Sequence, residues 1–434
     1  MSRVKPLRRL AVLAAATIAV AGLASPATAG ATATATSRPP SSHQLTHHTR
    51  FFVDPNSKAA KQAIADLRAG HLTDARNMAK LASWPESFWL TEGTPEQVRA
   101  KVRGIMRAAK ATGTVPVLVL YNVPGRDCSN YSSGGAASAA AYDAWVRAVA
   151  VGIGDGKALT VVEPDGLALL PQDCGSGSDP DGALTTQRLA SIKSAIETLE
   201  RQPSTSVYVD GGTSNWQSPG VITQRLLAAG VRSAQGIALN VSNYQPTDQL
   251  NQYATWVSKC IHYATQGGTG TQESRAAECA GQYYSASAPN DGAPGNAVTF
   301  EDPSTWHWSD AWYDSHVGTV PADRLTHYVL DTSRNGLGAW TAPDKYTDDE
   351  HWCNAPGRGV GVRPTADTGQ PLADAYLYVK IIGESDGTCH RGTPGPGDPE
   401  YGGVEDPPAG AWWPDFAHTL ARNARPSLNW NLPH

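Results

Sequence analysis

Short apolar runs alternate with longer segments of helical period along most of this chain, and this alternation constrains its fold more than any other feature. Residues 94–97 read TPEQ, a helix N-cap with Pro in the first turn, and apolar residues follow at helical spacing from Val98 to Ala109. Residues 115–120 are then apolar and rich in valine, as in a strand buried on both faces. The pattern predicts parallel strands connected by helices.

The same cycle repeats, with helices predicted around 142–149 and 189–199. Further strands are predicted at 159–162, 207–209, 237–239, 328–330 and 376–381. A polar residue follows each of the six predicted strands, in the order Asp127, Asp165, Asp210, Asn240, Asp331 and Asp386. One aspartate there is often only a turn former, but such a succession is typical of the active-site edge of a β/α barrel. No GxGxxG turn follows the first strand, which disfavours a dinucleotide site in an open doubly wound sheet.

The N-terminal residues have the layout of a secretory signal peptide, with a basic head, an apolar run over 10–23 and small residues at 27–29. The run is about fourteen residues, short of the roughly twenty that span a bilayer. Arg8 and Arg9 also fit a twin-arginine signal, so both export routes stay open. We expect a signal peptide over 1–29, a flexible Ala-, Thr-, Ser- and Pro-rich segment over 30–48 and one folded domain over 50–434. The protein is therefore predicted to be secreted, with no membrane attachment after cleavage.

Composition narrows the class of partner. The net charge of −5 is small for this length and no basic stripe is visible along the sequence, so nucleic acid is a poor candidate. Thirteen Trp against five Phe favour stacking on sugar rings, although about half of these Trp are expected to serve the core. Six Cys in an exported chain predict disulfides, whose pairing the sequence alone does not choose. No CxxC or closely spaced Cys/His set occurs, so neither a metal nor another cofactor is expected.

Several carboxylates converging on one edge, with Trp nearby and no nucleophile motif, point to glycosidic bond cleavage. Asp165 is the best candidate for the acid, because it follows a buried strand and a stiff Pro and precedes the apolar residues 167–170. Asp127 would raise the pKa of Asp165 through like charge, unless the adjacent Arg126 depresses the pKa of Asp127 instead. The alternative for residues 163–165 is a plain strand-to-loop turn.

Several motifs occur at the ends of the predicted strands. The first reads LYNVPGRDC at 120–128, followed by SSGG at 132–135, and the second reads VVEPD at 161–165. The others read DGG with Trp216 from 210, NVSNY from 240, DTSRNG from 331, WCN from 352, and Lys380 with GESDG from 383. Together these motifs resemble those of family-6 glycoside hydrolases, which comprise cellobiohydrolases and endoglucanases. The resemblance runs in family order from about Phe51 to Pro426, so residues 50–434 are identified as a glycoside hydrolase domain.

The resemblance implies an inverting β-1,4-glucanase on a distorted, incomplete β/α barrel. It implies that Asp165 is the general acid and that Asp127 tunes the pKa of Asp165. Asp386 matches an aspartate whose role as the catalytic base is contested in the family. The resemblance implies that Tyr121 crowds the sugar at the cleavage point. The implied sugar-contacting residues are Trp89, Asp210, Trp216, Asn240, Trp352, Lys380 and Glu384. The implied disulfides are Cys128 with Cys174 and Cys353 with Cys389, which leaves Cys260 and Cys279 for each other.

Two departures and two loops bear on the mode of action. Thr213 stands where the family commonly has His, and Gly166 follows the acid where Ser, Leu or Ala is usual. The short segment 127–142 is similar to that of open-cleft endoglucanases, whereas the long segment 388–408 is nearer to that of cellobiohydrolases. Endo action is preferred, because closing a tunnel needs both loops. The alternatives are an exo-acting cellobiohydrolase, an enzyme for mixed-linkage β-glucan and a carbohydrate-binding barrel without activity. The expected partner is a β-1,4-glucan, and the chain is expected to be a monomer.

Overall fold

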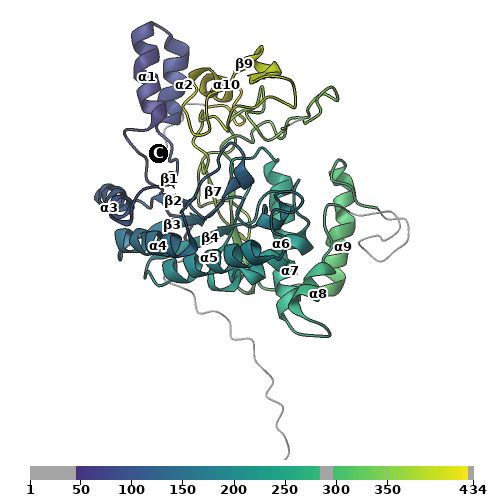
Figure 1. Cartoon of the computed structure of the whole chain (residues 1–434). Helices are drawn as coiled ribbons and strands as arrows, with labels where there is room; N and C mark the ends of the chain where they lie inside the picture. Colours follow the sequence, from purple (N-terminus) through teal and green to yellow (C-terminus); the bar gives the residue numbers. More distant parts are fainter. Residues whose placement is uncertain (1–44, 284–296, 349, 429–434) are drawn as a thin grey trace, which may run out of the picture. The chain divides into compact units, whose positions relative to one another are not determined.

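The computed structural model describes residues 45–283, 297–348 and 350–428 (Figure 1). The predicted signal peptide and residues 30–44 of the predicted flexible segment lie outside these ranges. Within them, no helix is both long enough and apolar enough to cross a membrane.

A single parallel sheet of seven strands forms the centre of the domain, and its strands are neighbours in chain order. Between the two edge strands, the backbone N–H of Ser87 donates to the carbonyl of Tyr378 at 3.0 Å, so the sheet curls almost onto itself. The prediction of an incomplete β/α barrel is confirmed. The strands are β1 (Phe88–Leu90), β2 (Val117–Leu120), β3 (Ala158–Val162), β4 (Thr205–Asp210), β5 (Gly236–Leu239), β6 (His327–Asp331) and β7 (Ala373–Leu377).

Alternate residues of the strands serve two separate cores, as the two-residue period of a strand requires. Val119, Val161 and Tyr208 belong to a cluster of buried side chains inside the curled sheet. Leu118 and Val162, one residue along, belong to the larger cluster between the sheet and its helices. Both faces of the sheet are therefore buried, which explains why these strands are apolar runs without polar alternation.

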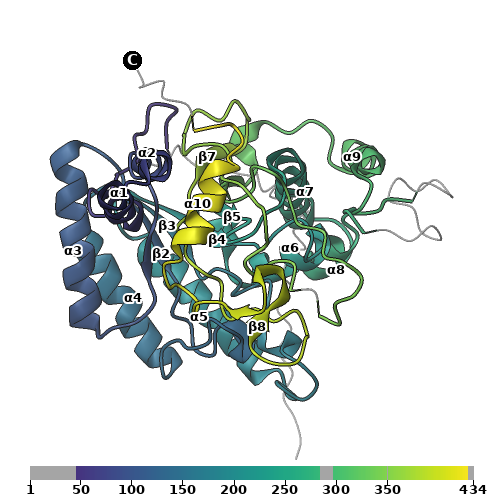
Figure 2. The same cartoon turned by 90° about the horizontal axis from the view of Figure 1, so that it is seen from above.

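Helices cover the outside of the sheet, with α3, α4 and α5 following one another around it (Figure 2). The Thr94 side chain accepts the N–H of Gln97 at 3.3 Å, and the Gln97 side chain accepts the N–H of Thr94 at 2.8 Å, so the predicted capping box begins α3. The helices are α1 (Lys58–Ala69), α2 (Leu72–Leu81), α3 (Pro95–Thr112), α4 (Ala139–Ile153), α5 (Ala183–Leu199), α6 (Pro219–Ala228), α7 (Thr247–Thr265), α8 (Gln272–Ala277), α9 (His307–His316) and α10 (Pro414–Arg422).

One strand prediction needs correction, and one strand was missed. The strand predicted at 376–381 ends at Leu377, because the buried Asp331 carboxylate accepts the N–H groups of Val379 at 3.2 Å and Lys380 at 2.9 Å. A side chain thus replaces the strand ladder there. The strand β1 was not predicted, since three residues are too few to show a period.

Several non-glycine residues adopt positive φ where the strands end, among them Glu163 at 51°, Asp165 at 62° and Asn240 at 66°. Such values are costly and cluster at functional sites of many proteins. Here they turn the chain sharply at the carboxyl edge of the sheet, where the predicted polar residues lie.

Candidate active site

A hollow of about 620 Å³ opens at the carboxyl edge of the sheet. Its lining combines aromatic rings, carboxylates and one lysine. These are Trp89, Tyr121, Asp127, Tyr131, Asp165, Trp216, Trp352, Lys380, Glu384 and Asp386. The polar residues that follow β2, β3 and β7 are therefore brought together in one place.

Asp165 lies two residues past Glu163 on the sharp turn after β3, and its backbone N–H donates to Asp210 at 3.0 Å. Burial raises the pKa of Asp165 to about 7, and the negative charges of Asp127 and Asp386 add to this rise more than Lys380 offsets it. A carboxyl with this pKa holds a proton near neutral pH. It is equipped to donate that proton to a bound molecule.

Asp127 lies on a tight loop after β2, with φ of 60°. Burial raises its pKa, although a hydrogen bond of 2.6 Å from the N–H of Ser132 opposes the rise. The Arg126 guanidinium donates instead to the carbonyls of Thr91 and Ser132, at 2.8 and 2.9 Å. Arg126 therefore does not depress the pKa of Asp127 below its ordinary value, and the charge of Asp127 raises the pKa of Asp165, the first of the two effects that the sequence left open.

Asp386 is surrounded by cations and donors. One carboxylate oxygen lies 2.9 Å from Lys380 Nζ, and the other lies 2.8 Å from Arg334 Nη1 and accepts the N–H of Asn354 at 2.9 Å. Burial alone would raise the pKa of Asp386, but Arg334 and Lys380 outweigh it, so the pKa falls below its ordinary value. Asp386 is thus a stable negative charge and a weak proton acceptor.

Five of the seven predicted sugar-contacting residues line the hollow: Trp89, Trp216, Trp352, Lys380 and Glu384. Asp210 and Asn240 do not, because both are buried behind it. Asn240 donates to the carbonyl of Asp331 at 2.8 Å and accepts from Thr213 at 3.1 Å, so it braces the ends of β5 and β6. Their direct contact with sugar stays a prediction, and the contacts seen here are with neighbouring turns of the chain.

Asp210 instead holds the turn that carries Asp165. One of its oxygens accepts the N–H groups of Asp165 and Gly212, at 3.0 and 2.9 Å. The other oxygen is buried without a hydrogen-bond partner among the described residues. Burial, with the charge of Asp165 beside it, raises the pKa of Asp210 well above its ordinary value.

The comparisons with known proteins settle the family. The model of the family described as "Glycosyl hydrolases family 6" matches residues 46–424. The chain belongs to glycosyl hydrolase family 6. It is similar to Endoglucanase A of Cellulomonas fimi, at 30% identity over 376 residues that cover 86% of this chain and 61% of that protein. The chain thus spans less than two thirds of that relative.

Other family-6 relatives are named as endoglucanases or as cellobiohydrolases. Endoglucanase 1 of Streptomyces halstedii is 30% identical over 79% of this chain and 83% of that protein. The probable 1,4-beta-D-glucan cellobiohydrolase C of Aspergillus fumigatus is 28% identical over 80% of this chain and 71% of that protein. Among solved structures, the endoglucanase Cel6 from Mycobacterium tuberculosis, in complex with a thio-linked cellobioside, matches with a TM-score of 0.61 at 33% identity. That match covers 86% of this chain and 97% of that one.

Two residues that the sequence did not single out hold the family-6 site together. Arg188 is buried and donates to the carbonyls of Gly125 at 2.9 Å and Gly166 at 3.2 Å, so it joins the Asp127 loop to the Asp165 loop. Tyr131 donates to Glu350 at 2.5 Å, and the other oxygen of Glu350 accepts two further backbone N–H groups at 390 and 391. Neither residue lies within a strand-end motif, so their role in holding the loops of the site is visible only from their contacts in the structure.

The structure forms the two disulfides that the resemblance implies, Cys128–Cys174 and Cys353–Cys389, and the remaining pair Cys260–Cys279. The first fixes the loop that carries Asp127. The second fixes the segment that contains Trp352 and the chain just after Asp386.

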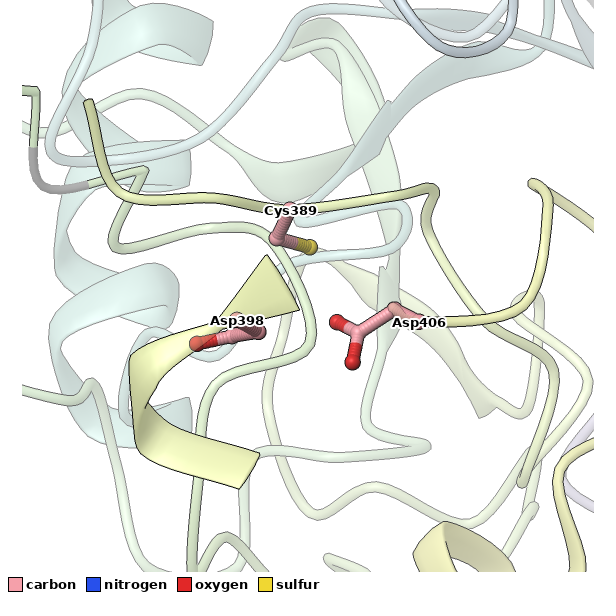
Figure 3. A group of neighbouring side chains, drawn as sticks. All are labelled: Cys389, Asp398 and Asp406. Atoms are coloured by element: carbon pink, nitrogen blue, oxygen red, sulfur yellow. The ribbon is translucent and has the colours of Figure 1, made fainter. Parts of the chain in front are cut away.

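Among the residues that the structure describes, one group has three potential metal ligands within 4.8 Å of one another: Cys389, Asp398 and Asp406. Figure 3 shows the Asp406 carboxylate directed toward the other two. The donor set does not suit a metal ion, because Cys389 is in a disulfide and Asp398 forms a 2.8 Å ion pair with Arg391. The group anchors the segment 388–408 instead.

Proposed function

We propose that this protein is a secreted β-1,4-glucanase that hydrolyses cellulose or related β-glucans with inversion, using Asp165 as the general acid. The observation that carries the proposal is the Asp165 carboxyl, whose pKa of about 7 keeps a proton available inside an aromatic-walled hollow. Family membership and the endoglucanases among its relatives support the choice of a glucan substrate.

The acid step breaks the bond between the anomeric carbon and the bridging oxygen. Asp165 gives its proton to that oxygen, so the leaving sugar departs as a neutral alcohol. Water attacks the anomeric carbon from the opposite face and inverts its configuration, and the proton that the water loses passes to solvent in the hollow. A second proton from solvent restores Asp165.

Asp386 supports this step by its charge and not as the proton acceptor. Both of its oxygens are already engaged by cations, and its pKa is lowered. Its fixed negative charge stabilises the positive charge that develops on the sugar ring, and it helps to keep Asp165 protonated. Asp127 adds to the same effect on the pKa of Asp165.

The aromatic residues bind the glucan chain. Trp89, Trp216 and Trp352 present ring faces to sugar rings, while Lys380 and Glu384 hydrogen-bond hydroxyl groups. The Tyr121 ring packs edge-on against Trp89, with ring centres 5.5 Å apart, and narrows the hollow beside Asp165. A narrowed site favours a distorted sugar ring, which lies closer to the transition state.

Endo action is the preferred mode. Endoglucanase A of Cellulomonas fimi, Endoglucanase 1 of Streptomyces halstedii and the Mycobacterium tuberculosis structure are 30%, 30% and 33% identical and are named endoglucanases. The cellobiohydrolase of Aspergillus fumigatus is 28% identical. We further propose that the chain acts as a monomer outside the cell, after cleavage near residue 29.

The test is an assay of the purified protein on carboxymethyl-cellulose, crystalline cellulose and barley β-glucan. Endo action predicts that viscosity falls early, while few reducing ends have formed. Rapid cellobiose release without loss of viscosity would overturn endo action, and no product from any of the three polymers would overturn the glucanase proposal.

A further inference from the structure

A second hollow lies at the amino-terminal ends of the strands, whereas the active site lies at their carboxyl ends. The volume of this second hollow is about 1190 Å³, and it lies between residues 45–50, the helix α3 and the turn from α4 to β3. Ala158, Ser204 and Ser206, at or near the starts of β3 and β4, form part of its wall. A molecule bound here would leave the catalytic hollow open.

The lining of this second hollow is strongly basic. Glu96 and Asp155 are its acidic side chains, and both are exposed. Its cations outnumber them three to one: Arg50, Arg99, Arg103, Arg107, Lys110 and Lys157. Four of these cations lie within residues 99–110, and the fold adds Arg50 and Lys157 from distant parts of the chain.

The protein itself does not neutralise most of this charge. Among the described residues, Arg103, Arg107, Lys110 and Lys157 form no ion pair within 4.0 Å. The chain before Asp54 contains no Asp or Glu at all, so its N-terminal segment has no carboxylate side chain to offer. Positive charges gathered in this way repel one another, and an anionic ligand relieves that repulsion.

The lining also differs from that of a neutral glucan site. Among the described residues, no Trp, Tyr or Phe contributes to it, whereas three Trp line the catalytic hollow. Stacking on the apolar face of a sugar ring is therefore not available here, and charge is the main means of recognition.

We propose that this basic hollow binds a linear acidic polysaccharide through its carboxylates. Arg99, Arg103 and Arg107 recur every four residues on α3, which places them about 6 Å apart along the helix axis. Guanidinium groups bind carboxylates in a two-pronged geometry, and a regular row of them matches a polymer that carries one carboxylate per sugar. Such binding holds the enzyme on a polyanionic matrix while the cleft works on neutral glucan.

Affinity electrophoresis in native gels that contain polygalacturonate tests the proposal without any hydrolysis. The test variant carries Arg103→Glu and Arg107→Glu, on the exposed face of α3. The control variant carries Lys61→Glu and Arg68→Glu on the exposed face of α1, so its net charge changes equally while the basic hollow stays intact. Gels without polymer correct for mobility, and activity on barley β-glucan reports that both variants fold.

The wild type and the α1 control should be retarded by polygalacturonate at low salt, and the α3 variant should bind at least tenfold more weakly. Retardation should fade as salt is added, since the ligand and the exposed cations are screened. Equal losses in both variants, or no retardation of the wild type, would overturn the site. Retardation by a polyphosphate chain but not by polygalacturonate would overturn the choice of carboxylates.

Discussion

Asp165 acts as an acid only while its carboxyl keeps a proton, and burial raises its pKa to about 7. Asp165→Asn removes the proton and keeps the shape of the side chain. We predict a loss of about 10²–10⁴-fold in kcat on unactivated β-glucan, and a much smaller loss on a dinitrophenyl cellobioside, whose leaving group needs no proton. Asp367→Asn, the same change at an exposed residue, should alter neither rate. Equal losses on both substrates would show that Asp165 is not the acid.

Burial is the largest cause of the raised pKa of Asp165, and the charge of Asp127 is the next largest. Two negative charges close together are unfavourable, so Asp127 favours the protonated form of Asp165. Asp127→Asn removes one of these charges, so the pKa of Asp165 should fall. The protonated acid is then lost at lower pH, and the basic limb of kcat/KM against pH should move down by roughly one pH unit. A limb that stays in place or moves to higher pH would contradict the role of Asp127.

Residue identities in the hollow were largely predictable from sequence, because motifs at strand ends name Asp127, Asp165 and Asp386 without structural information. The raised pKa of Asp165 was also expected from its apolar surroundings, but the lowered pKa of Asp386 was not. The pKa of Asp386 depends on Arg334 and Lys380, which approach it from β6 and β7. Asp210 and Asn240 were assigned to substrate binding from the same motifs, and their hydrogen bonds to the turns at the strand ends were not predicted.

At the scale of elements, the loop after β2 depends on a contact with a distant segment. The Tyr131 hydroxyl donates to Glu350, and Glu350 also accepts the N–H groups of His390 and Arg391. Tyr131→Phe removes the contact, which should free the Asp127 loop and raise KM about two- to tenfold with a smaller effect on kcat.

A double-mutant cycle isolates this contact from other effects of the substitutions. Tyr131→Phe and Glu350→Gln are measured singly and together, with ln(kcat/KM) as the readout. Once one partner is gone, the second substitution should cost less than it does alone. Additive losses would mean that the two side chains act separately.

The elements themselves were predicted unevenly, for physical reasons. Strands β2 to β6 are short apolar runs that alternate with segments of helical period, so their places could be predicted from this alternation. The end of β7 did not follow, because Asp331 takes the N–H groups that the strand ladder would use. The sequence did not predict the basic hollow, because its cations come from three separate segments: α3, the turn before β3 and the N-terminal segment.

At the scale of the whole molecule, the edge of the sheet away from the active site contains a half-buried ionic network. His327 Nδ1 lies 2.7 Å from Asp374, whose other oxygen accepts the Tyr208 hydroxyl at 2.6 Å. Burial opposes the charged imidazole, but Asp374 outweighs it and the pKa of His327 is raised. Because the folded pKa exceeds the unfolded one, the stabilisation is complete below about pH 6.5 and is lost as pH rises through the folded value.

His327→Gln should therefore lower the free energy of unfolding more at about pH 5.5 than at about pH 9, by an amount on the order of 1 kcal/mol. Urea titrations of both proteins at the two pH values give this difference. His307→Gln, at an exposed position, serves as the control. A penalty that is larger at the higher pH would contradict the assignment of a charged His327.

The central claim is that a protonated Asp165 and an attacking water act from opposite faces of the sugar. The anomer that the purified protein releases from cellohexaose, followed by proton NMR in the first minutes before mutarotation, tests this most directly. Inversion predicts that the α-anomer appears first and the β-anomer grows only as it equilibrates. First appearance of the β-anomer would contradict the mechanism.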